Sequence, residues 1–148
     1  MLLERCRTLL AALWAGALLA VALIAAPSAF EVLERAQAGR LVARVFELEA
    51  FTSCCCALLL MMFDRRIQRD HDGRAVTAGF LLPAGAFFSV VSGYYGLLPM
   101  MEAARAGQGS VSFLTLHAIS MGFYGLRTLL ALALAWRLAA GLTRPRAS

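Results

Sequence analysis

The sequence contains no lysine: all 14 basic residues are arginine, a composition that suggests a GC-rich bacterial gene. Only 16% of the residues are charged, whereas 61% are hydrophobic, and the mean hydropathy is +0.73. A soluble domain of 148 residues does not carry so much apolar surface. The net charge of +5 does not indicate nucleic-acid binding, because the arginines lie mainly between apolar segments. We therefore expect a single integral membrane domain over residues 1–148, with the lipid bilayer rather than nucleic acid as its partner.

Signatures of enzymes and cofactor proteins are also missing. The sequence has no nucleophile motif, P-loop or dinucleotide fingerprint. Haem ligation inside the bilayer by two histidines would need a second intramembrane histidine, and His71 lies in a charged segment. The consecutive thiols of Cys54, Cys55 and Cys56 cannot converge on one ion within a helix, so we interpret them as small buried residues. We expect no enzymatic activity and no cofactor, and the sequence leaves metal binding open.

Four apolar runs are long enough to cross about 30 Å of hydrocarbon as helices. They cover about residues 8–26, 41–63, 75–98 and 112–137. Pro27 is expected to end the first run. The following segment, about 30–44, mixes charged and apolar residues, which predicts an amphipathic interfacial helix or an extension of the next span. We predict an all-α fold, a four-transmembrane-helix bundle with a short amphipathic segment after helix 1.

The arginines near the ends of the helices predict how the bundle is oriented in the membrane. Residues 64–74 form a charged segment that we expect to be a solvated loop, and a second loop is expected over residues 100–110. One side of the membrane would then carry nine arginines: Arg5, Arg7, Arg65, Arg66, Arg69, Arg74, Arg137, Arg144 and Arg146. The other side would carry only Arg35, Arg40, Arg44 and Arg105. The positive-inside rule therefore places both termini in the cytoplasm, and we predict a multi-pass protein of the bacterial inner membrane.

Two apolar runs carry small residues at intervals of four, which lets another helix approach closely. These stripes are Ala12, Gly16 and Ala20 in the first run, and Gly85, Ser89 and Gly93 in the third. One hypothesis is that they dock the chain onto a larger complex.

The last run carries polar residues along one helical face. His117, Ser120, Tyr124 and Arg127 follow one another at i, i+3, i+7 and i+10. Polar groups are costly in hydrocarbon, so such a face is a functional-site hypothesis. Arg127 lies deepest, and we expect no acidic residue at its depth on another span.

The second run has a polar stripe as well, formed by Glu49, Thr52 or Ser53, and Cys56. Counted from Arg44 and Ser112, near which the two spans are expected to enter the membrane, Glu49 and His117 each lie about five residues, or roughly 8 Å, below the outer surface. We therefore expect them at the same level. The resulting candidate polar site comprises Glu49, Tyr94, Tyr95, His117, Ser120, Tyr124 and Arg127. Such groups relay protons, bind a cation, or hold helices together as polar contacts, and the sequence does not choose among these roles.

Three motifs resemble domain-of-unknown-function family 4149, small bacterial integral membrane proteins whose eukaryotic relative is transmembrane protein 205. The motifs are Ala-Pro-Ser-Ala-Phe at residues 26–30, Ala38-Gly39-Arg40 followed by Phe46, and Phe-Leu-Thr-Leu-His-Ala-Ile-Ser-Met at residues 113–121. The resemblance implies a four-span membrane protein without an established activity.

Together these features favour a small binding or transport-accessory protein with a polar site between helices 2 and 4. Four helices are few for a monomeric transporter, so a pore would need a homo-oligomer or a larger membrane complex. The alternatives are a membrane-embedded enzyme or cofactor protein that handles haem or lipid, and a structural subunit of a larger complex.

Overall fold

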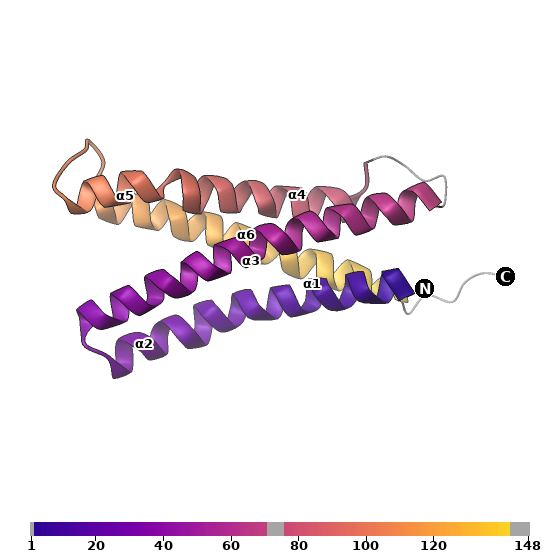
Figure 1. The fold of residues 1–148 in the computed structure, drawn as a ribbon, viewed down its shortest axis with the longest axis horizontal. Helices are drawn as coiled ribbons and strands as arrows, with labels where there is room; N and C mark the ends of the chain where they lie inside the picture. The colour runs from indigo at the N-terminus through magenta and orange to yellow at the C-terminus, as the bar shows by residue number, and fades with distance from the viewer. Residues whose placement is uncertain (1, 71–75, 143–148) are drawn as a thin grey trace.

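The computed structural model describes residues 2–70 and 76–142, and every regular element in this part of the chain is helical. Four long helical segments lie side by side, and consecutive segments run antiparallel, so that the second and the fourth run in the same direction (Figure 1). They consist of α1 (Leu2–Ala20), η1 (Val21–Ala25) and α2 (Ala26–Val32); α3 (Arg35–Asp70); α4 (Ala78–Val90), η2 (Val91–Gly96) and α5 (Leu98–Arg105); and α6 (Phe113–Leu142). Each segment is long and apolar enough to cross a membrane, which confirms the predicted all-α four-helix bundle and a multi-pass membrane protein.

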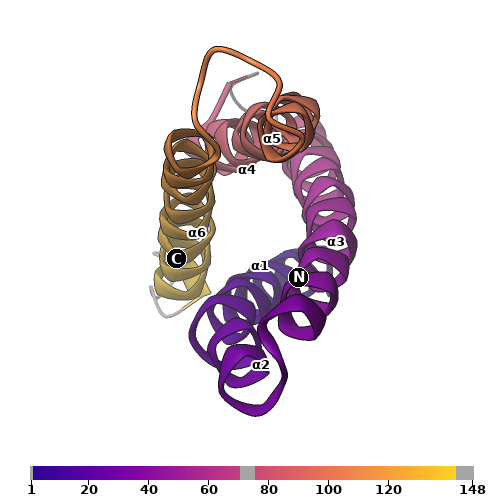
Figure 2. The same cartoon turned by 90° about the vertical axis from the view of Figure 1, so that its left-hand side faces the viewer.

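The four segments form a ring when the bundle is viewed along its axis (Figure 2). α1 contacts α3 and α6, and α4 contacts the same two helices on the opposite side. α3 and α6 therefore face each other diagonally across the bundle. Because α1 begins where α6 ends, both ends of the described chain lie at one end of the bundle (Figure 1).

Both the surface and the interior of the bundle are apolar. Leu13, Phe51, Phe88 and Leu129, one from each long segment, are exposed by 63 to 65%. In water this arrangement would be unfavourable, whereas lipid tails are as apolar as the side chains they contact. The interior packs larger side chains such as Leu18, Leu60 and Leu134 among buried alanines. Helix packing therefore depends on close fit and on buried polar contacts.

Pro27 was expected to end the first run, and Pro99 directly follows the expected end of the third run at about residue 98, but both lie within long helical segments. Pro27 does not end the first segment, which continues to Val32, and Pro99 is followed by helix as far as Arg105. Proline lacks an N–H group and its ring clashes with the carbonyl four residues earlier. In both segments a π-helical stretch, η1 or η2, precedes the proline and widens the helix there. The second connector therefore begins near residue 106 rather than at residue 100.

α3 is longer than the hydrophobic run that predicts it. Its 36 residues extend over about 54 Å, well beyond the roughly 30 Å of hydrocarbon. The amphipathic segment over residues 30–44 therefore belongs mainly to the start of α3, which is the extension alternative. At the other end, residues 64–70 are helical, so the expected loop over 64–74 is wrong for this part, and residues 71–74 lie outside the described part of the chain.

The two small-residue stripes have different surroundings. Gly93 is buried, and a Cβ atom there would overlap the side chain of Phe123, so η2 approaches α6 closely at this point. By contrast, Ala12, Gly16 and Ala20 are all exposed on α1. The stripe on the third segment therefore packs within the bundle, whereas the stripe on α1 faces outward.

Candidate functional site

A buried ion pair joins the two diagonal helices at the centre of the bundle. Arg127 Nη2 on α6 donates to Glu49 Oε2 on α3 at 2.6 Å, and the two side chains are only 4% and 7% exposed. The expectation that Arg127 has no acidic partner is therefore wrong. Both residues lie 14 positions after the start of their helix, Arg35 for α3 and Phe113 for α6, which places both about 21 Å along the axis.

Further hydrogen bonds extend this pair to the first helix. Ser53 Oγ, one turn after Glu49, donates to Glu49 Oε1 at 2.5 Å. Trp14 Nε1 on α1 in turn donates to Ser53 Oγ at 2.8 Å. Because the indole N–H, the serine hydroxyl, the carboxylate and the guanidinium are connected in series, α1, α3 and α6 share one polar network.

Tyr124 packs beside the pair on α6. Its hydroxyl donates to the backbone carbonyl oxygen of Leu18 at 2.8 Å, and its ring centroid lies 4.6 Å from the guanidinium carbon of Arg127. The edge of the Phe46 ring contacts the same tyrosine, with centroids 5.3 Å apart. The cation–π contact between Tyr124 and Arg127 helps to hold the arginine side chain extended toward α3. We call Trp14, Glu49, Ser53, Tyr124 and Arg127 the central cluster.

A cleft of about 250 Å³ lies beside the central cluster, between the first helical segment and α3. Its lining residues are Trp14, Ala17, Leu18, Val21, Val45, Leu48, Glu49, Thr52 and Ser53. Most of them are apolar, and the polar atoms come from one side of α3 together with the indole of Trp14. A largely apolar cavity with a few polar groups is the usual form of a small-molecule site, although this one is smaller than the usual range of about 300–1,000 Å³.

The seven residues predicted as one polar site fall into separate places. Only Glu49, Tyr124 and Arg127 belong to the central cluster. The expected level arrangement of Glu49 and His117 is wrong, because His117 lies only four positions after the start of α6, about 15 Å from the depth of Arg127. His117 is exposed and its ring stacks on Phe113, with centroids 5.7 Å apart.

The other three predicted residues lie near η2. Ser120 Oγ donates to the backbone carbonyl oxygen of Gly93 at 2.8 Å, so it links α6 to η2. Tyr94 and Tyr95 contact each other edge to face, with centroids 5.1 Å apart, and Tyr95 is exposed. These contacts hold helices and rings together and do not bring the three residues into the central cluster.

Sequence reasoning missed the role of Trp14. Its position in the middle of an apolar run was a usable signal, because a buried indole N–H usually finds a hydrogen-bond acceptor. Ser53 was predicted only as one of two choices with Thr52. The structure selects Ser53, which is fully buried, whereas Thr52 is exposed and donates to the carbonyl oxygen of Leu48.

A second buried ion pair lies at the end of the bundle where α1 begins. Arg7 Nη1 on α1 is 3.1 Å from Asp64 Oδ1 on α3, and Thr77 Oγ1 donates to Asp64 Oδ2 at 2.5 Å. Asp64 was expected in a solvated loop, but it is 1% exposed within α3. We call Arg7, Asp64 and Thr77 the end cluster. Within residues 2–70 and 76–142, no three His, Cys, Asp or Glu side chains form a group suited to a metal ion.

One family model matches the chain, over residues 9–110, and its description is "Domain of unknown function (DUF4149)". The match contains Trp14, Glu49 and Ser53, and it ends before α6. Tyr124 and Arg127 therefore lie outside the matched region, as does the motif at residues 113–121. No curated protein and no solved structure matches the chain.

Proposed function

We propose that the chain, which belongs to the DUF4149 family, is a small membrane protein that binds an amphipathic molecule in the cleft between α1 and α3. The observation that carries this proposal is a largely apolar cleft whose lining includes Glu49, a buried acidic residue with spare acceptor capacity. Apolar walls accept a hydrocarbon body that partitions into the bilayer. The buried polar groups orient its head group.

The hydrogen bonds at the cleft define what that head group supplies. The N–H of Trp14 and the hydroxyl of Ser53 already donate within the cluster, and the hydroxyl of Thr52 donates to a backbone carbonyl. Each carboxylate oxygen of Glu49 accepts one hydrogen bond from a described side chain, although a carboxylate has about four acceptor positions. The cleft therefore offers acceptors, and its ligand brings a donor such as a hydroxyl or an amine.

We further propose that the protein lies in a bacterial inner membrane with both termini in the cytoplasm. The support is the arginine distribution in the sequence, because the predicted topology puts nine arginines on one side of the membrane and four on the other. Since four helices are few for a transporter, we propose that the protein presents its ligand to a second copy or to a larger membrane complex.

A fluorescence experiment tests ligand binding at the cleft. The chain has two tryptophans, so Trp136→Phe leaves Trp14 as the only one, and Trp14 lines the cleft. In lipid nanodiscs, 11-bromoundecanol should quench Trp14 fluorescence saturably. Its methyl ether, which cannot donate a hydrogen bond, should bind at least about fivefold more weakly, because it leaves buried acceptors unpaired.

Two variants test whether the alcohol binds next to Glu49. Glu49→Gln removes the charged acceptor and should weaken the alcohol at least about fivefold. Glu47→Gln is the matched control, because Glu47 is exposed on the same helix and pairs with Arg44. Equal, unsaturable quenching by the alcohol and the ether would contradict the proposal, and the central cluster would then be a purely structural contact between helices.

A further inference from the structure

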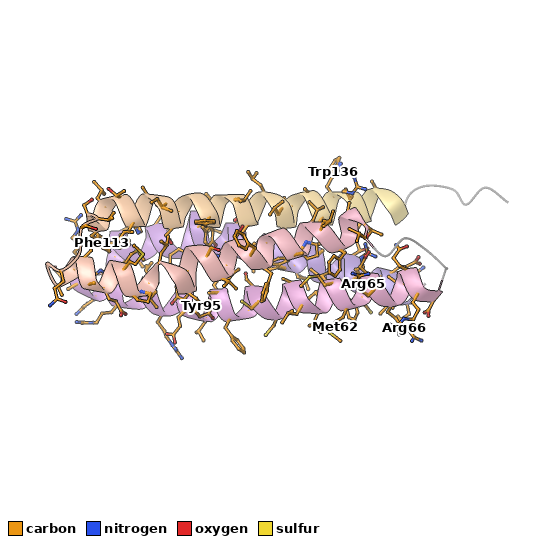
Figure 3. The ribbon with its side chains drawn as sticks, turned by 90° about the horizontal axis from the view of Figure 1, so that it is seen from above. Met62, Arg65, Arg66, Tyr95, Phe113 and Trp136 are labelled. Carbon is orange, nitrogen blue, oxygen red and sulfur yellow. The ribbon has the colours of Figure 1, made fainter. Side chains whose placement is uncertain are left out.

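The end cluster borders a second cavity, of about 220 Å³, which is separate from the cleft beside the central cluster. Its lining residues are Arg7, Asp64, Gln68, Thr77, Ala78, Gly79, Leu134, Arg137 and Leu138. Arg65, Arg66 and Trp136 lie toward this end of the bundle, and Phe113 lies at the opposite end (Figure 3). Trp136 is 78% exposed beside Arg137, an arrangement typical of the boundary between hydrocarbon and water.

Arg7 has donor capacity that the ion pair leaves unused. The residue is 9% exposed, and its Nε atom is buried with no hydrogen-bond partner among the described residues. A buried donor without an acceptor costs about 1–3 kcal/mol. Asp64 Oδ1 in the end cluster and Arg127 Nε in the central cluster are also buried without a hydrogen-bond partner among the described residues, so the missing partner indicates a ligand only together with the cavity that Arg7 lines. The unpartnered N–H of a buried cation that lines a cavity favours an anionic ligand there.

The first turn of α4 adds further donors. Thr77 caps this helix by accepting from the N–H of Phe80. The first backbone N–H groups of a helix have no acceptor within it, and Ala78 and Gly79 at this position line the cavity. A Cβ atom on Gly79 would overlap Arg7 and Asp64, so glycine lets the helix start lie directly against the ion pair.

The charges that line the cavity also favour an anion. Arg7 and Arg137 contribute two positive charges, and Asp64 contributes one negative charge. Asp64 is engaged by Arg7 and Thr77, so its charge is largely compensated within the end cluster. Arg137 is exposed at the cavity and has room to turn toward a ligand.

We propose that this cavity binds a phosphate group, held by Arg7, Arg137 and the first turn of α4. The volume accommodates a phosphate and its ester carbons, so the rest of the ligand lies outside the cavity. A membrane phospholipid and a soluble phosphate ester both present this chemistry at the depth of Trp136. This site does not depend on the proposed function of the central cleft.

Native mass spectrometry of the full chain in detergent tests the proposal. The probes are dioleoyl phosphatidylglycerol, dioleoylglycerol, which has the same chains without phosphate, and soluble glycerol 3-phosphate. We expect saturable binding of phosphatidylglycerol and at least about fivefold weaker binding of dioleoylglycerol, because charged hydrogen bonds are lost. If glycerol 3-phosphate displaces the lipid, the ligand is a soluble ester; if it does not, the ligand is a lipid.

Two matched variants distinguish phosphatidylglycerol binding in the cavity from its general attraction to surface arginines. Arg137→Gln should weaken phosphatidylglycerol at least about fivefold. The control is Arg66→Gln, which removes an exposed arginine that pairs with Asp70 at the same end of the bundle without lining the cavity. It should change binding by less than about twofold, as expected for a screened surface charge.

A double variant tests Arg7 without leaving a buried charge unpaired. Arg7→Met combined with Asp64→Leu replaces the ion pair by apolar side chains, which membrane and soluble interiors tolerate. Its melting temperature should stay within a few degrees of the parent protein, and its affinity for phosphatidylglycerol should fall at least about fivefold. Unchanged affinity in both this variant and Arg137→Gln would overturn the proposal, as would equal binding of the two lipids.

Discussion

The two buried ion pairs use the same chemistry in different places. Glu49 and Arg127 connect diagonal helices in the middle of the bundle, and both oxygens of the carboxylate accept hydrogen bonds from neighbouring side chains. Arg7 and Asp64 connect adjacent helices at one end, next to a cavity with an exposed arginine. Depth in the membrane accounts for the difference. Glu49 of the central pair lines the apolar cleft, whereas both residues of the end pair line a cavity together with Arg137.

The largest effect should follow from breaking the central pair on one side. Arg127→Met leaves the Glu49 carboxylate buried without its cation, which should destabilise the fold by about 3–5 kcal/mol. The measurement is the yield and thermal unfolding of purified protein. The double variant Arg127→Met with Glu49→Leu should recover most of this loss, because it removes both charges. If Arg127→Met is as stable as the parent protein, water must reach Glu49 and Arg127 in the folded protein.

Breaking the end pair should cost less. Arg7→Met leaves Asp64 with the hydrogen bond from Thr77 and beside the end cavity, and the Arg7 side chain is more exposed than that of Arg127 (11% against 4%). We therefore expect a loss at or below the lower end of the range of about 3–5 kcal/mol for a broken buried pair. Thermal unfolding under the same conditions as for Arg127→Met provides the comparison. If Arg7→Met is the more damaging of the two, the proposed difference in depth is wrong.

A glycine substitution disturbs the end pair without changing its charge. A Cβ atom at Gly79 would overlap Arg7 and Asp64, so Gly79→Ala should destabilise by about 1–3 kcal/mol through overpacking. Gly16→Ala is the control, because a Cβ there meets no atom within 4 Å. Equal unfolding temperatures for the two variants would mean that the first turn of α4 does not lie against the pair.

The smallest effect should come from the edge of the central cluster. Tyr124→Phe removes the hydrogen bond to the carbonyl oxygen of Leu18 but keeps the ring beside Arg127. Hydrogen bonds between membrane helices average about 0.6 kcal/mol, so the melting temperature should fall only slightly. Tyr124→Leu, which also removes the ring, should cost more. Similar losses in both variants would indicate that the ring contact contributes nothing.

The fold was predictable because hydropathy marks membrane helices directly. The four apolar runs were enough to predict the bundle. Helix ends were less accessible, because an amphipathic start such as Arg35–Arg44 continues a helix without raising its hydropathy. Pro27 and Pro99 were misleading for a related reason, since a π-helical stretch before each proline is not visible in the sequence.

The candidate site was predicted only in part because depth was counted from those ends. Placing the start of the second span near Arg44 rather than Arg35 moved Glu49 toward the surface by about nine residues, or roughly 14 Å. Glu49 was then matched with His117 instead of Arg127. The residue types were informative, since both charges in the hydrocarbon were recognised, but their pairing required the correct origin for each helix. Asp64 was misplaced because the second run was expected to end at about residue 63, whereas α3 continues to Asp70.

The diagonal pair also has a consequence for how the chain is made. Glu49 and Arg127 are 78 positions apart, so a ribosome that adds 5–20 residues per second produces the arginine about 4–16 s after the glutamate. During this interval α3 has its carboxylate without its cation. Until α6 is inserted, Glu49 must therefore be protonated or must face the insertion machinery. α6 completes the middle of the bundle, and a chain truncated before α6 should retain an unpaired Glu49 in α3.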